Sequence, residues 1–452
     1  MARMFGTDGV RGIANGDLTC ELAMKIGAAG AYVLTSAVHN PRILLGQDTR
    51  RSGDMLSAAL AAGICSVGGD VINAGVIPTP AMAYLARLYS ADAAVMISAS
   101  HNTMEYNGIK WFDGNGFKLS DELEDRIEAI VTGGEDLPRP TGRGVGHCVQ
   151  AQRAVEEYKE FLKSTATARF DGKKIVLDCA NGASSGIAAD VFRELGATVV
   201  SRGDEPDGNN INDECGSTHP ERLQELLTEE LADAGFAFDG DADRVIAADE
   251  LGNIVDGDRI MGMCAEWLRG QGRLKNDSLV VTVMSNMGLK KRMDEIGIHV
   301  EETAVGDRYV MERMRQKGLV LGGEQSGHVI FLDLNTTGDG ILSAIQVMNI
   351  LCSTGKRLSR LAGSVPIYPQ VLANVKVAPE QKEAAMTDED MRRLIAQSEE
   401  ELGNSGRVLV RASGTEPLIR IMLEGADEEQ INRLAVSIAN VLVSKYKGKI
   451  KV

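Results

Sequence analysis

The chain has 452 residues, of which 44% are hydrophobic and 25% charged, and its formal net charge is −16. This length predicts about three domains, and this composition is ordinary for a soluble globular protein. The acidic balance argues against general nucleic-acid binding, which needs a basic face. It is compatible with a small anionic substrate held by a local cluster of arginine and lysine.

The N-terminal segment and the cysteines predict the compartment. No apolar run approaches the roughly 18 residues that span a membrane, and the first eight residues lack the apolar stretch of a signal peptide. The seven cysteines are scattered without a CxxC pair, as in proteins of a reducing compartment. We therefore expect a cytoplasmic protein with neither a membrane nor a nucleic-acid partner.

Three segments of the chain repeat one pattern: an apolar strand, a polar turn, a helix, and then a glycine followed by a second strand. Strands as apolar as these are typical of sheets that are covered on both faces, so each segment predicts an α/β unit. Their spacing of about 100–130 residues indicates three similar domains. The expected units are 43–46, 53–67 and 69–72; 174–177, 185–195 and 196–200; and 279–283, 287–296 and 297–300.

The last part of the chain predicts a smaller α+β domain, because adjacent strands alternate with charged helices. The expected strands are 371–377, 407–411 and 418–423, and the expected helices are 387–402 and 427–446. A Gly/Pro-rich stretch at 133–146 suggests a boundary near residue 145. We expect domains at 1–145, 146–255, 256–368 and 369–452.

A polar turn, Ser98-Ala99-Ser100-His101-Asn102, follows the apolar strand 93–97. It lies beyond the C-terminal end of that strand, where open α/β sheets bind ligands, and it offers a hydroxyl that could carry a phosphate. Serine followed by asparagine is also common turn chemistry. Lys110 follows closely and adds a cation. Between the two serines we favour Ser100, which lies further into the turn and beside His101.

Asp239, Asp241 and Asp243 alternate along the chain between two apolar runs. Three such carboxylates can converge on one hard divalent cation. The spacing also resembles the start of a calcium-binding EF-hand loop, but the sixth position, which needs glycine, holds Arg244. The flanking residues read as strands rather than helices. We expect a metal loop, with turn capping by the carboxylates as the structural alternative.

Two further loops carry ligand-binding chemistry. In the glycine-dense segment 322–328, Glu324 and Ser326 could hydrogen-bond a ligand, and His328 is a candidate acid or base. The loop 411–417, with Arg420 shortly after it, combines hydroxyls, backbone N–H groups and guanidiniums as in a phosphate cradle. It lacks the lysine of a P-loop, and an exposed hairpin loop is the alternative.

These segments, together with Phe5-Gly6-Thr7-Asp8-Gly9-Val10-Arg11-Gly12 at the start, resemble in this order the α-D-phosphohexomutase superfamily over essentially the whole chain. The resemblance implies three similar α/β domains with mixed sheets and a smaller α+β C-terminal domain around a central cleft. The opening segment, Gly306-Asp307-Arg308-Tyr309 and 323–328 favour its glucosamine branch. Thr103 and Ala412 depart from the family pattern, each replacing a proline.

The resemblance also implies a reaction and a set of site residues. The reaction is the interconversion of glucosamine 6-phosphate and glucosamine 1-phosphate, which feeds amino-sugar synthesis. It would use a phosphoserine enzyme, one Mg²⁺ per chain, and glucosamine or glucose 1,6-bisphosphate as intermediate or activator. The metal residues would be Ser100, Asp239, Asp241 and Asp243; the catalytic residues Ser100, His101, Lys110, Arg11, Arg244 and His328; and the substrate-binding residues Arg308, Glu324, Ser326, Arg411, Ser413, Gly414, Thr415 and Arg420.

Several alternatives stay open at this point. Within the family the chain could be a phosphomannomutase or phosphoglucomutase, and outside it a metal-dependent sugar phosphatase or a non-enzymatic sugar-phosphate sensor. The general base could be His328 or a residue near Arg308. A homodimer is compatible with the sequence, which does not specify an oligomeric state.

Overall fold

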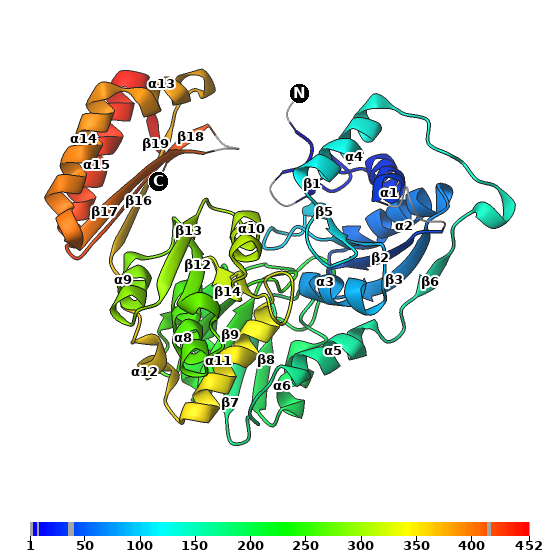
Figure 1. Ribbon diagram of the computed structural model, residues 1–452, viewed down its shortest axis with the longest axis horizontal. Helices are drawn as coiled ribbons and strands as arrows, with labels where there is room; N and C mark the ends of the chain where they lie inside the picture. The colour runs from blue at the N-terminus through cyan, green and yellow to red at the C-terminus, as the bar shows by residue number, and fades with distance from the viewer. Residues whose placement is uncertain (1–2, 7–8, 35–39, 414–416, 452) are drawn as a thin grey trace. The chain divides into compact units, whose positions relative to one another are not determined.

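The computed structural model describes residues 3–6, 9–34, 40–413 and 417–451, and its chain forms two compact units (Figure 1). The larger unit comprises Met1–Met284 and Ile296–Ser364, and the smaller comprises Ser285–Glu295 and Val365–Val452. Among the described helices, none combines the length and the apolar character that a membrane span requires.

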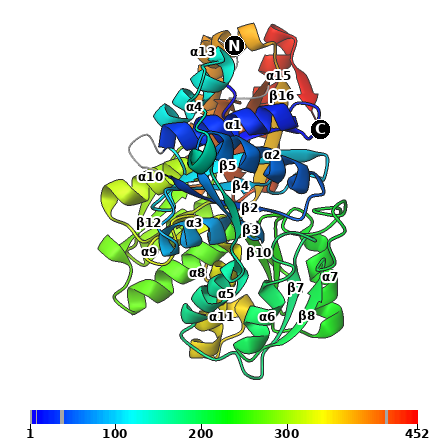
Figure 2. The same cartoon turned by 90° about the vertical axis from the view of Figure 1, so that its right-hand side faces the viewer.

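The first sheet of the larger unit is mixed and has six strands. Its elements are β1 (Val10–Ile13), α1 (Cys20–Leu34), β2 (Arg42–Gln47), α2 (Ser52–Ser66), β3 (Asp70–Val76), α3 (Thr79–Leu88), β4 (Ala93–Ile97), β5 (Tyr106–Asp113), α4 (Asp121–Gly133) and β6 (Cys148–Gln150). The strand order is β1-β5-β4-β2-β3-β6. Helices α1, α2 and α4 cover one face and α3 the other (Figures 1 and 2). β2, buried except for Arg42, pairs in parallel with the fully buried β4, so the two strands end at the same edge of this sheet.

The second sheet carries the three aspartates. Its elements are α5 (Ala154–Ser164), β7 (Lys174–Asp178), α6 (Ala188–Glu194), β8 (Thr198–Arg202), α7 (Pro220–Glu230), β9 (Ala234–Phe238), β10 (Val245–Asp249) and β11 (Ile254–Val255). The order is β11-β10-β9-β7-β8. β7 is parallel to β8 and β9, whereas β9 and β10 form an antiparallel hairpin.

The third sheet has the order β13-β12-β14-β15. Its elements in the larger unit are α8 (Gly257–Gly270), β12 (Ser278–Thr282), β13 (His299–Thr303), α10 (Asp307–Lys317), β14 (Leu321–Gly323), β15 (Val329–Phe331), α11 (Gly340–Thr354) and α12 (Leu358–Ala362). Helix α11 is buried along most of its length and packs against α8. Its first residue, Gly340, donates its N–H to the carbonyl of Ala242 at 2.9 Å, so this helix supports the aspartate loop.

The smaller unit is an α+β structure. It contains α9 (Met287–Glu295), β16 (Gln370–Lys376), α13 (Lys382–Thr387), α14 (Glu389–Leu402), β17 (Gly406–Ala412), β18 (Leu418–Gly425), α15 (Glu428–Tyr446) and β19 (Lys449–Lys451). The antiparallel sheet has the order β17-β18-β16-β19 and packs on α14 and α15. The buried Glu424 carboxylate links α9 to β17, because it accepts hydrogen bonds from Met287 N at 3.1 Å and Arg407 Nε at 2.6 Å.

The structure confirms the expected fold class, with three mixed α/β sheets and a smaller α+β part. Element ends differ where side chains or turns cap the backbone. The helix expected from 387 begins at Glu389, because the Asp388 side chain caps it by accepting from Met391 N. The helix expected from 185 begins at Ala188, because 182–187 is a series of turns. β6 extends the first sheet to residue 150, pairing in parallel with β3.

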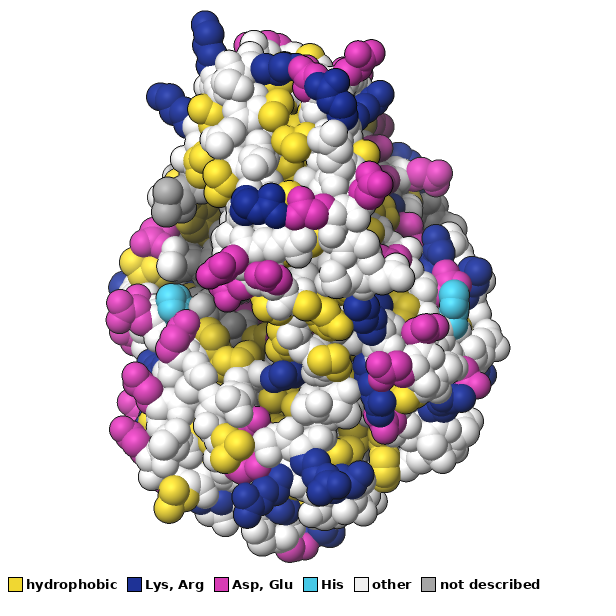
Figure 3. All heavy atoms as spheres, turned by 90° about the vertical axis from the view of Figure 1, so that its left-hand side faces the viewer, with side chains coloured by type: hydrophobic (Ala, Val, Ile, Leu, Met, Phe, Trp, Pro, Cys, Tyr) yellow, Lys and Arg dark blue, Asp and Glu magenta, His cyan; other side chains and the backbone are white. Residues whose placement is uncertain are grey.

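The protein surface carries charges of both signs. On the face seen in Figure 3, lysine and arginine are interspersed with aspartate and glutamate. This pattern agrees with the net charge of −16 and differs from the basic face of a nucleic-acid-binding protein.

Candidate active site

Ser100 lies in a buried turn that begins where β4 ends at Ile97. The side chain is 1% exposed, and the residue has a φ of +53°, in the left-handed region that non-glycine residues rarely adopt. Its backbone N–H donates to Ser98 Oγ at 2.9 Å. Ser98 itself is fully buried, and its hydroxyl donates to Asp48 Oδ2 at 2.6 Å. The two serines therefore differ in role, because only the Ser100 hydroxyl faces the aspartate loop.

Asp239, Asp241 and Asp243 occupy the tight connection between β9 and β10. All three are buried, and one carboxylate oxygen from each lies within 4.8 Å of the others. Ala242 has a φ of +57°, which turns the backbone so that alternate side chains converge. The flanking strands exclude a helix–loop–helix calcium site, as the sequence predicted.

The serine turn and the aspartate loop meet directly. Ser100 Oγ donates to Asp239 Oδ2 at 2.7 Å. Thr79, at the start of α3, donates its N–H to Asp241 O at 3.0 Å and its hydroxyl to Asp241 Oδ2 at 2.7 Å. At Gly240 a Cβ would lie 2.6 Å from the Ser100 carbonyl oxygen, so glycine is required for this approach. Residues about 140 positions apart thereby form one site.

The aspartate cluster has the properties of a cation site. Among the described residues, Asp241 Oδ1 and Asp243 Oδ1 are buried and have no hydrogen-bond partner. Burial, reinforced by Asp243 and Asp241, raises the pKa of Asp239 well above its usual range. Buried carboxylates this close repel one another unless a positive charge lies between them. Their oxygen donors fit a hard divalent cation.

Basic groups surround Ser100 and the aspartates. Lys110, on β5 and 2% exposed, donates from Nζ to Asp241 Oδ2 at 2.8 Å. Arg244 Nη1 lies 3.2 Å from His101 Nδ1, which is 3.3 Å from Ser100 Oγ. Because a guanidinium can only donate, His101 Nδ1 holds a lone pair. Burial lowers the pKa of His101 to about 4, and Arg244 and Arg11 add to this effect.

His328 is a buried residue next to Asp243. Its Nδ1 is 3.6 Å from Asp243 Oδ1, and its Nε2 accepts the backbone N–H of Gly338 at 3.1 Å. Burial opposes protonation of this ring, but Asp243 raises its pKa to about 9. A proton on Nε2 would, however, face the Gly338 N–H, so we favour the neutral ring with its proton on Nδ1. The Nδ1–H of His328 then faces the Asp243 carboxylate at 3.6 Å, and the ring offers no lone pair to a substrate.

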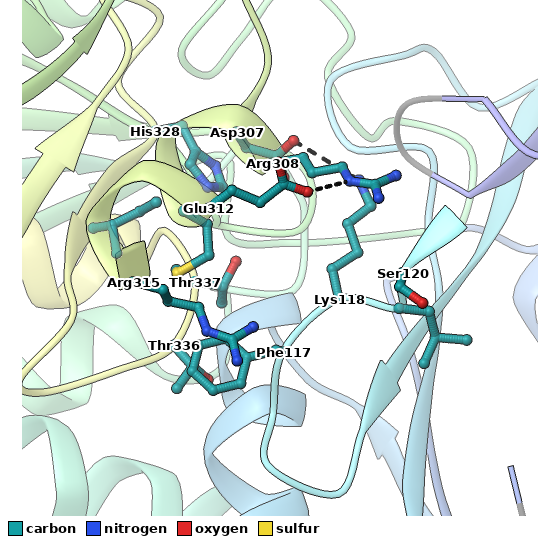
Figure 4. A pocket seen from close by; sticks show the side chains of 13 residues that line it. Phe117, Lys118, Ser120, Asp307, Arg308, Glu312, Arg315, His328, Thr336 and Thr337 are labelled. Carbon is teal, nitrogen blue, oxygen red and sulfur yellow. Dashed lines mark hydrogen bonds and ion pairs between the residues drawn. The ribbon is translucent and has the colours of Figure 1, made fainter. Parts of the chain in front are cut away.

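The loop predicted to contact sugar lies between β14 and β15. Glu324 is half-buried and accepts the Gly306 N–H at 3.0 Å, whereas Ser326 is exposed. Arg308, on α10, is bound by Asp121 and by Glu312, the latter at 3.0 Å. Next to this loop is a cavity of about 110 Å³. Arg308 and His328 line it together with Lys118, and Figure 4 shows Arg308 and Lys118 extending toward one another.

The predicted phosphate loop lies in the smaller unit. Arg411 on β17 pairs in register with Arg420 on β18, and burial together with Arg420 lowers the pKa of Arg411. Ser413 is 4% exposed and donates its N–H to the carbonyl of Leu418 at 2.9 Å. Gly414 and Thr415 lie outside the described residues. Two guanidiniums on neighbouring strands have the chemistry to bind an anion.

Four residues in or around this site were missed from the sequence: Asp48, Arg50, Thr79 and Asn212. Asp48 and Arg50 directly follow strand β2, in the same position relative to their strand as Ser100 relative to β4. That position was the available signal, because ligand-binding groups collect at this edge. Asn212 lies in an irregular segment of the second domain and carried no signal.

Comparison with protein families covers nearly the whole chain. Residues 2–137, 155–252 and 256–368 match alpha/beta/alpha domains I, II and III of the phosphoglucomutase/phosphomannomutase family, and residues 372–441 match its C-terminal domain. Among solved structures, a phosphoglucomutase/phosphomannomutase family protein from Burkholderia thailandensis superposes with a TM-score of 0.82 at 24% identity, covering 100% of this chain and 99% of that one. An N-acetylphosphoglucosamine mutase from Aspergillus fumigatus has a TM-score of 0.68 at 18% identity, with 98% and 96% covered. At these identities the two structures show the shared fold.

Curated relatives are far more similar in sequence. A phosphoglucosamine mutase from Thermoanaerobacter sp. (strain X514) is 56% identical over 445 residues, covering 98% of this chain and 100% of the relative. Another, from Clostridium novyi (strain NT), is 54% identical over 446 residues, covering 98% and 99%. The serine turn, the aspartate loop and these comparisons lead to one conclusion: the chain belongs to the phosphoglucomutase/phosphomannomutase family and, within it, to the phosphoglucosamine mutases.

Proposed function

We propose that the enzyme interconverts glucosamine 6-phosphate and glucosamine 1-phosphate through a phosphorylated Ser100. The observation that carries this proposal is the 2.7 Å contact between Ser100 Oγ and Asp239 in a buried cluster of three carboxylates. Relatives that are 54–56% identical over 98% of the chain support the choice of glucosamine phosphates. All seven cysteines are free thiols, which supports a reducing cytoplasm as the compartment.

The transfer has two balanced halves. In the first, a sugar hydroxyl oxygen attacks the phosphorus on Ser100; the new P–O bond forms, the bond to Oγ breaks, and the hydroxyl proton passes to a base. This yields a 1,6-bisphosphate. After the sugar reverses its orientation, Ser100 Oγ attacks the other phosphoryl group; the new bond from phosphorus to Oγ forms and the bond to the sugar oxygen breaks. That oxygen takes back the proton from the base, which restores the phosphoenzyme and releases the isomer.

Asp239, Asp241, Asp243 and the oxygen on Ser100 would hold a divalent cation, which we propose is Mg²⁺. When bound, it offsets negative charge on the transferring phosphoryl group. The fungal N-acetylphosphoglucosamine mutase that shares this fold was solved with GlcNAc-6P and magnesium, which agrees with this choice. Within the chain, Lys110 at 2.8 Å from Asp241 brings a second positive charge to the same place.

The two histidines have supporting roles in this proposal. The lone pair of His101 faces Arg244, and that of His328 accepts the Gly338 N–H. Each ring is therefore occupied by a protein donor, which argues against either as the acceptor of the sugar proton. Arg244 instead brings N–H groups close to Ser100, where a phosphoryl group carries negative charge, and its Nη1 is held by the lone pair of His101 Nδ1.

Phosphopeptide mapping and activity of two serine variants test the proposal. Intact-protein mass spectrometry of the purified enzyme should show one phosphate, which maps to Ser100. Ser100→Ala should lose that phosphate and nearly all mutase activity, whereas Ser98→Ala should keep the phosphate and lose activity only in part. Phosphate on Ser98, or near-native isomerisation by Ser100→Ala, would contradict the mechanism.

Turnover of competing substrates tests the specificity. Glucosamine phosphate should be turned over in preference to mannose and glucose phosphates. A strong preference for mannose or glucose phosphate would place the enzyme in the other branch of the family, and free phosphate accumulating faster than isomer would indicate a phosphatase.

A further inference from the structure

A buried ion pair lies directly behind the turn that carries Ser100. Asp48 and Arg50 follow strand β2, and both side chains have 0% exposure. Arg50 Nε donates to Asp48 Oδ2 at 2.8 Å, and the Arg50 backbone N–H donates to Asp48 Oδ1 at 2.9 Å. Neither residue is among the predicted ligands of metal or sugar, so the proposed reaction gives them no direct part.

All five N–H groups of the Arg50 guanidinium have acceptors. Nε binds Asp48, and the four remaining N–H groups are directed at the serine turn and the residues after it. Nη2 donates to the carbonyl oxygens of Ser100 at 2.9 Å and Asn102 at 2.7 Å. Nη1 donates to the carbonyls of Tyr106, at 3.1 Å, and Thr103. A single planar side chain thus fixes four carbonyls of one loop, which only arginine can do.

Asp48 of the same ion pair is linked through Ser98 to the backbone N–H of Ser100. Ser98 Oγ donates to Asp48 Oδ2 at 2.6 Å and accepts the Ser100 N–H at 2.9 Å. Asn212, from the second domain, adds its Nδ2 to the carbonyls of Ser100 at 2.9 Å and Asn102 at 2.8 Å. Both peptide groups that flank the Ser100 Cα are therefore held.

The backbone of Ser100 needs such support. Non-glycine residues rarely adopt the left-handed region, because the Cβ there crowds the following carbonyl oxygen, and Ser100 has a φ of +53°. That conformation aims Oγ at Asp239, 2.7 Å away. Without donors on its carbonyls, the turn would relax toward ordinary backbone angles and move the hydroxyl.

We infer that Arg50, oriented by Asp48, and Asn212, which binds the same two carbonyls, are positioning residues that hold the phosphoryl-carrying serine at the aspartate cluster. The inference rests on the proposed function, because it takes Ser100 as the carrier. Arg50 does not contact the sugar, so its loss should reduce the rate of transfer more than the affinity for substrate. A displacement of about 1 Å at a reacting atom can cost on the order of a hundredfold in rate.

The test compares Arg50→Lys with Arg42→Lys. Lysine keeps the charge but has three donors instead of five. Arg42, at the start of the same strand, also caps carbonyls with its guanidinium, donating to Tyr89 O at 3.0 Å and Ser90 O at 2.8 Å. It therefore controls for the loss of an arginine that binds a turn on this sheet but not at this site.

The activity of each variant is expressed per phosphorylated subunit, counted by intact-protein mass spectrometry. Arg50→Lys should lower kcat by roughly ten- to a hundredfold with KM for the sugar phosphate changed less than about threefold. Its ³¹P resonance from phosphoserine should shift or broaden relative to the native enzyme. Arg42→Lys should leave kcat, KM and the resonance unchanged. An Arg50→Lys enzyme with native kcat and an unchanged resonance would overturn the inference.

Asn212→Ala is a second test variant that leaves the Asp48–Arg50 ion pair intact. It tests the inference even if Arg50→Lys does not fold. It removes two donors from the same carbonyls and should lower kcat per phosphorylated subunit by about three- to tenfold, with KM unchanged. Native kcat in that variant would also overturn the inference. If the native enzyme carried no phosphoserine and did not isomerise the sugar phosphate, the proposed function itself would fail, which is a different outcome.

Discussion

Replacing Asp241 by asparagine separates the charge balance of the aspartate cluster from its ability to bind metal. In the metal-free protein the Asp241 carboxylate is attracted by Lys110 Nζ at 2.8 Å, worth about 6 kcal/mol at an effective dielectric constant of about 20. It is repelled by Asp243, whose nearest oxygen lies within 4.8 Å, by about 3.5 kcal/mol on the same scale. Burial raises the pKa of Asp239, which favours its neutral form and so lessens any further repulsion from this side chain. Burying the carboxylate has a further cost of several kcal/mol.

These opposing contributions nearly cancel. We therefore expect Asp241→Asn to change the free energy of unfolding of the metal-free protein by less than about 2 kcal/mol. Metal binding behaves differently. Even with water-like screening, one carboxylate in contact with a divalent cation at about 2.1 Å contributes about 4 kcal/mol. Its loss should weaken Mg²⁺ binding roughly a thousandfold.

Thermal unfolding with and without MgCl₂ measures both effects. The native enzyme should gain about 2.7 kcal/mol at a Mg²⁺ concentration a hundred times Kd, and EDTA should remove both this gain and the activity reversibly. Asp241→Asn should lose the gain and nearly all turnover. Asp249→Asn is the matched control, because Asp249 is a buried carboxylate at the other end of β10 that accepts from Leu251 N at 2.9 Å and Asn253 N at 3.0 Å. It should retain the Mg²⁺-dependent gain. An Asp241→Asn protein with a native Mg²⁺ response, or full activity of the metal-free native enzyme, would refute the reasoning.

Arg420→Ala should weaken binding of all sugar phosphates alike by about ten- to a hundredfold, because a charge-assisted contact to phosphate is worth about 1.5–3 kcal/mol. Glu324→Ala should instead change the preference between amino and hydroxyl sugars. KM values for glucosamine, glucose and mannose phosphates test both variants. A shift in sugar preference from Arg420→Ala would mean that Arg420 contacts the sugar and that its assignment to the phosphate is wrong. A pH effect is expected at Glu124, whose carboxyl is buried beside Arg3 and has its pKa raised to about 7 by that burial. Between about pH 4.5 and 7 the Glu124 carboxyl keeps its proton in the folded state and has lost it in the unfolded state. The free energy of unfolding therefore falls as the pH rises through this range. Glutamine has no proton to lose, so Glu124→Gln should be more stable than the native protein by about 1–2 kcal/mol at pH 8, allowing for partial screening. At pH 4.5 the two proteins should have nearly the same free energy of unfolding. Urea unfolding at the two pH values measures this, and an equal difference at both would contradict it.

The sequence by itself determined the local structure and the chemistry of single segments. Predominantly apolar runs such as 93–97 and 279–283 form buried strands because burial removes their apolar side chains from water, and turns follow them. The alternation of Asp239, Asp241 and Asp243 likewise specifies a cluster, because a short turn between two paired strands brings alternate side chains together. Such inferences hold over a few residues, where backbone geometry limits the outcomes.

The tertiary structure decided which of these segments meet and which atoms remain available. Ser98 and Ser100 are the same residue type in the same turn. Their roles are distinguished only by their partners, because Ser98 binds Asp48 and Ser100 binds Asp239. His328 is a plausible base in sequence, but the Gly338 N–H occupies its lone pair. The position of Arg50 after strand β2 was a signal, but its role was not predictable, because its four Nη N–H groups bind backbone carbonyls, which every residue has and no side-chain pattern reveals. Hydrogen bonds between distant segments depend on distance and direction in space, and the order of residues along the chain does not record either.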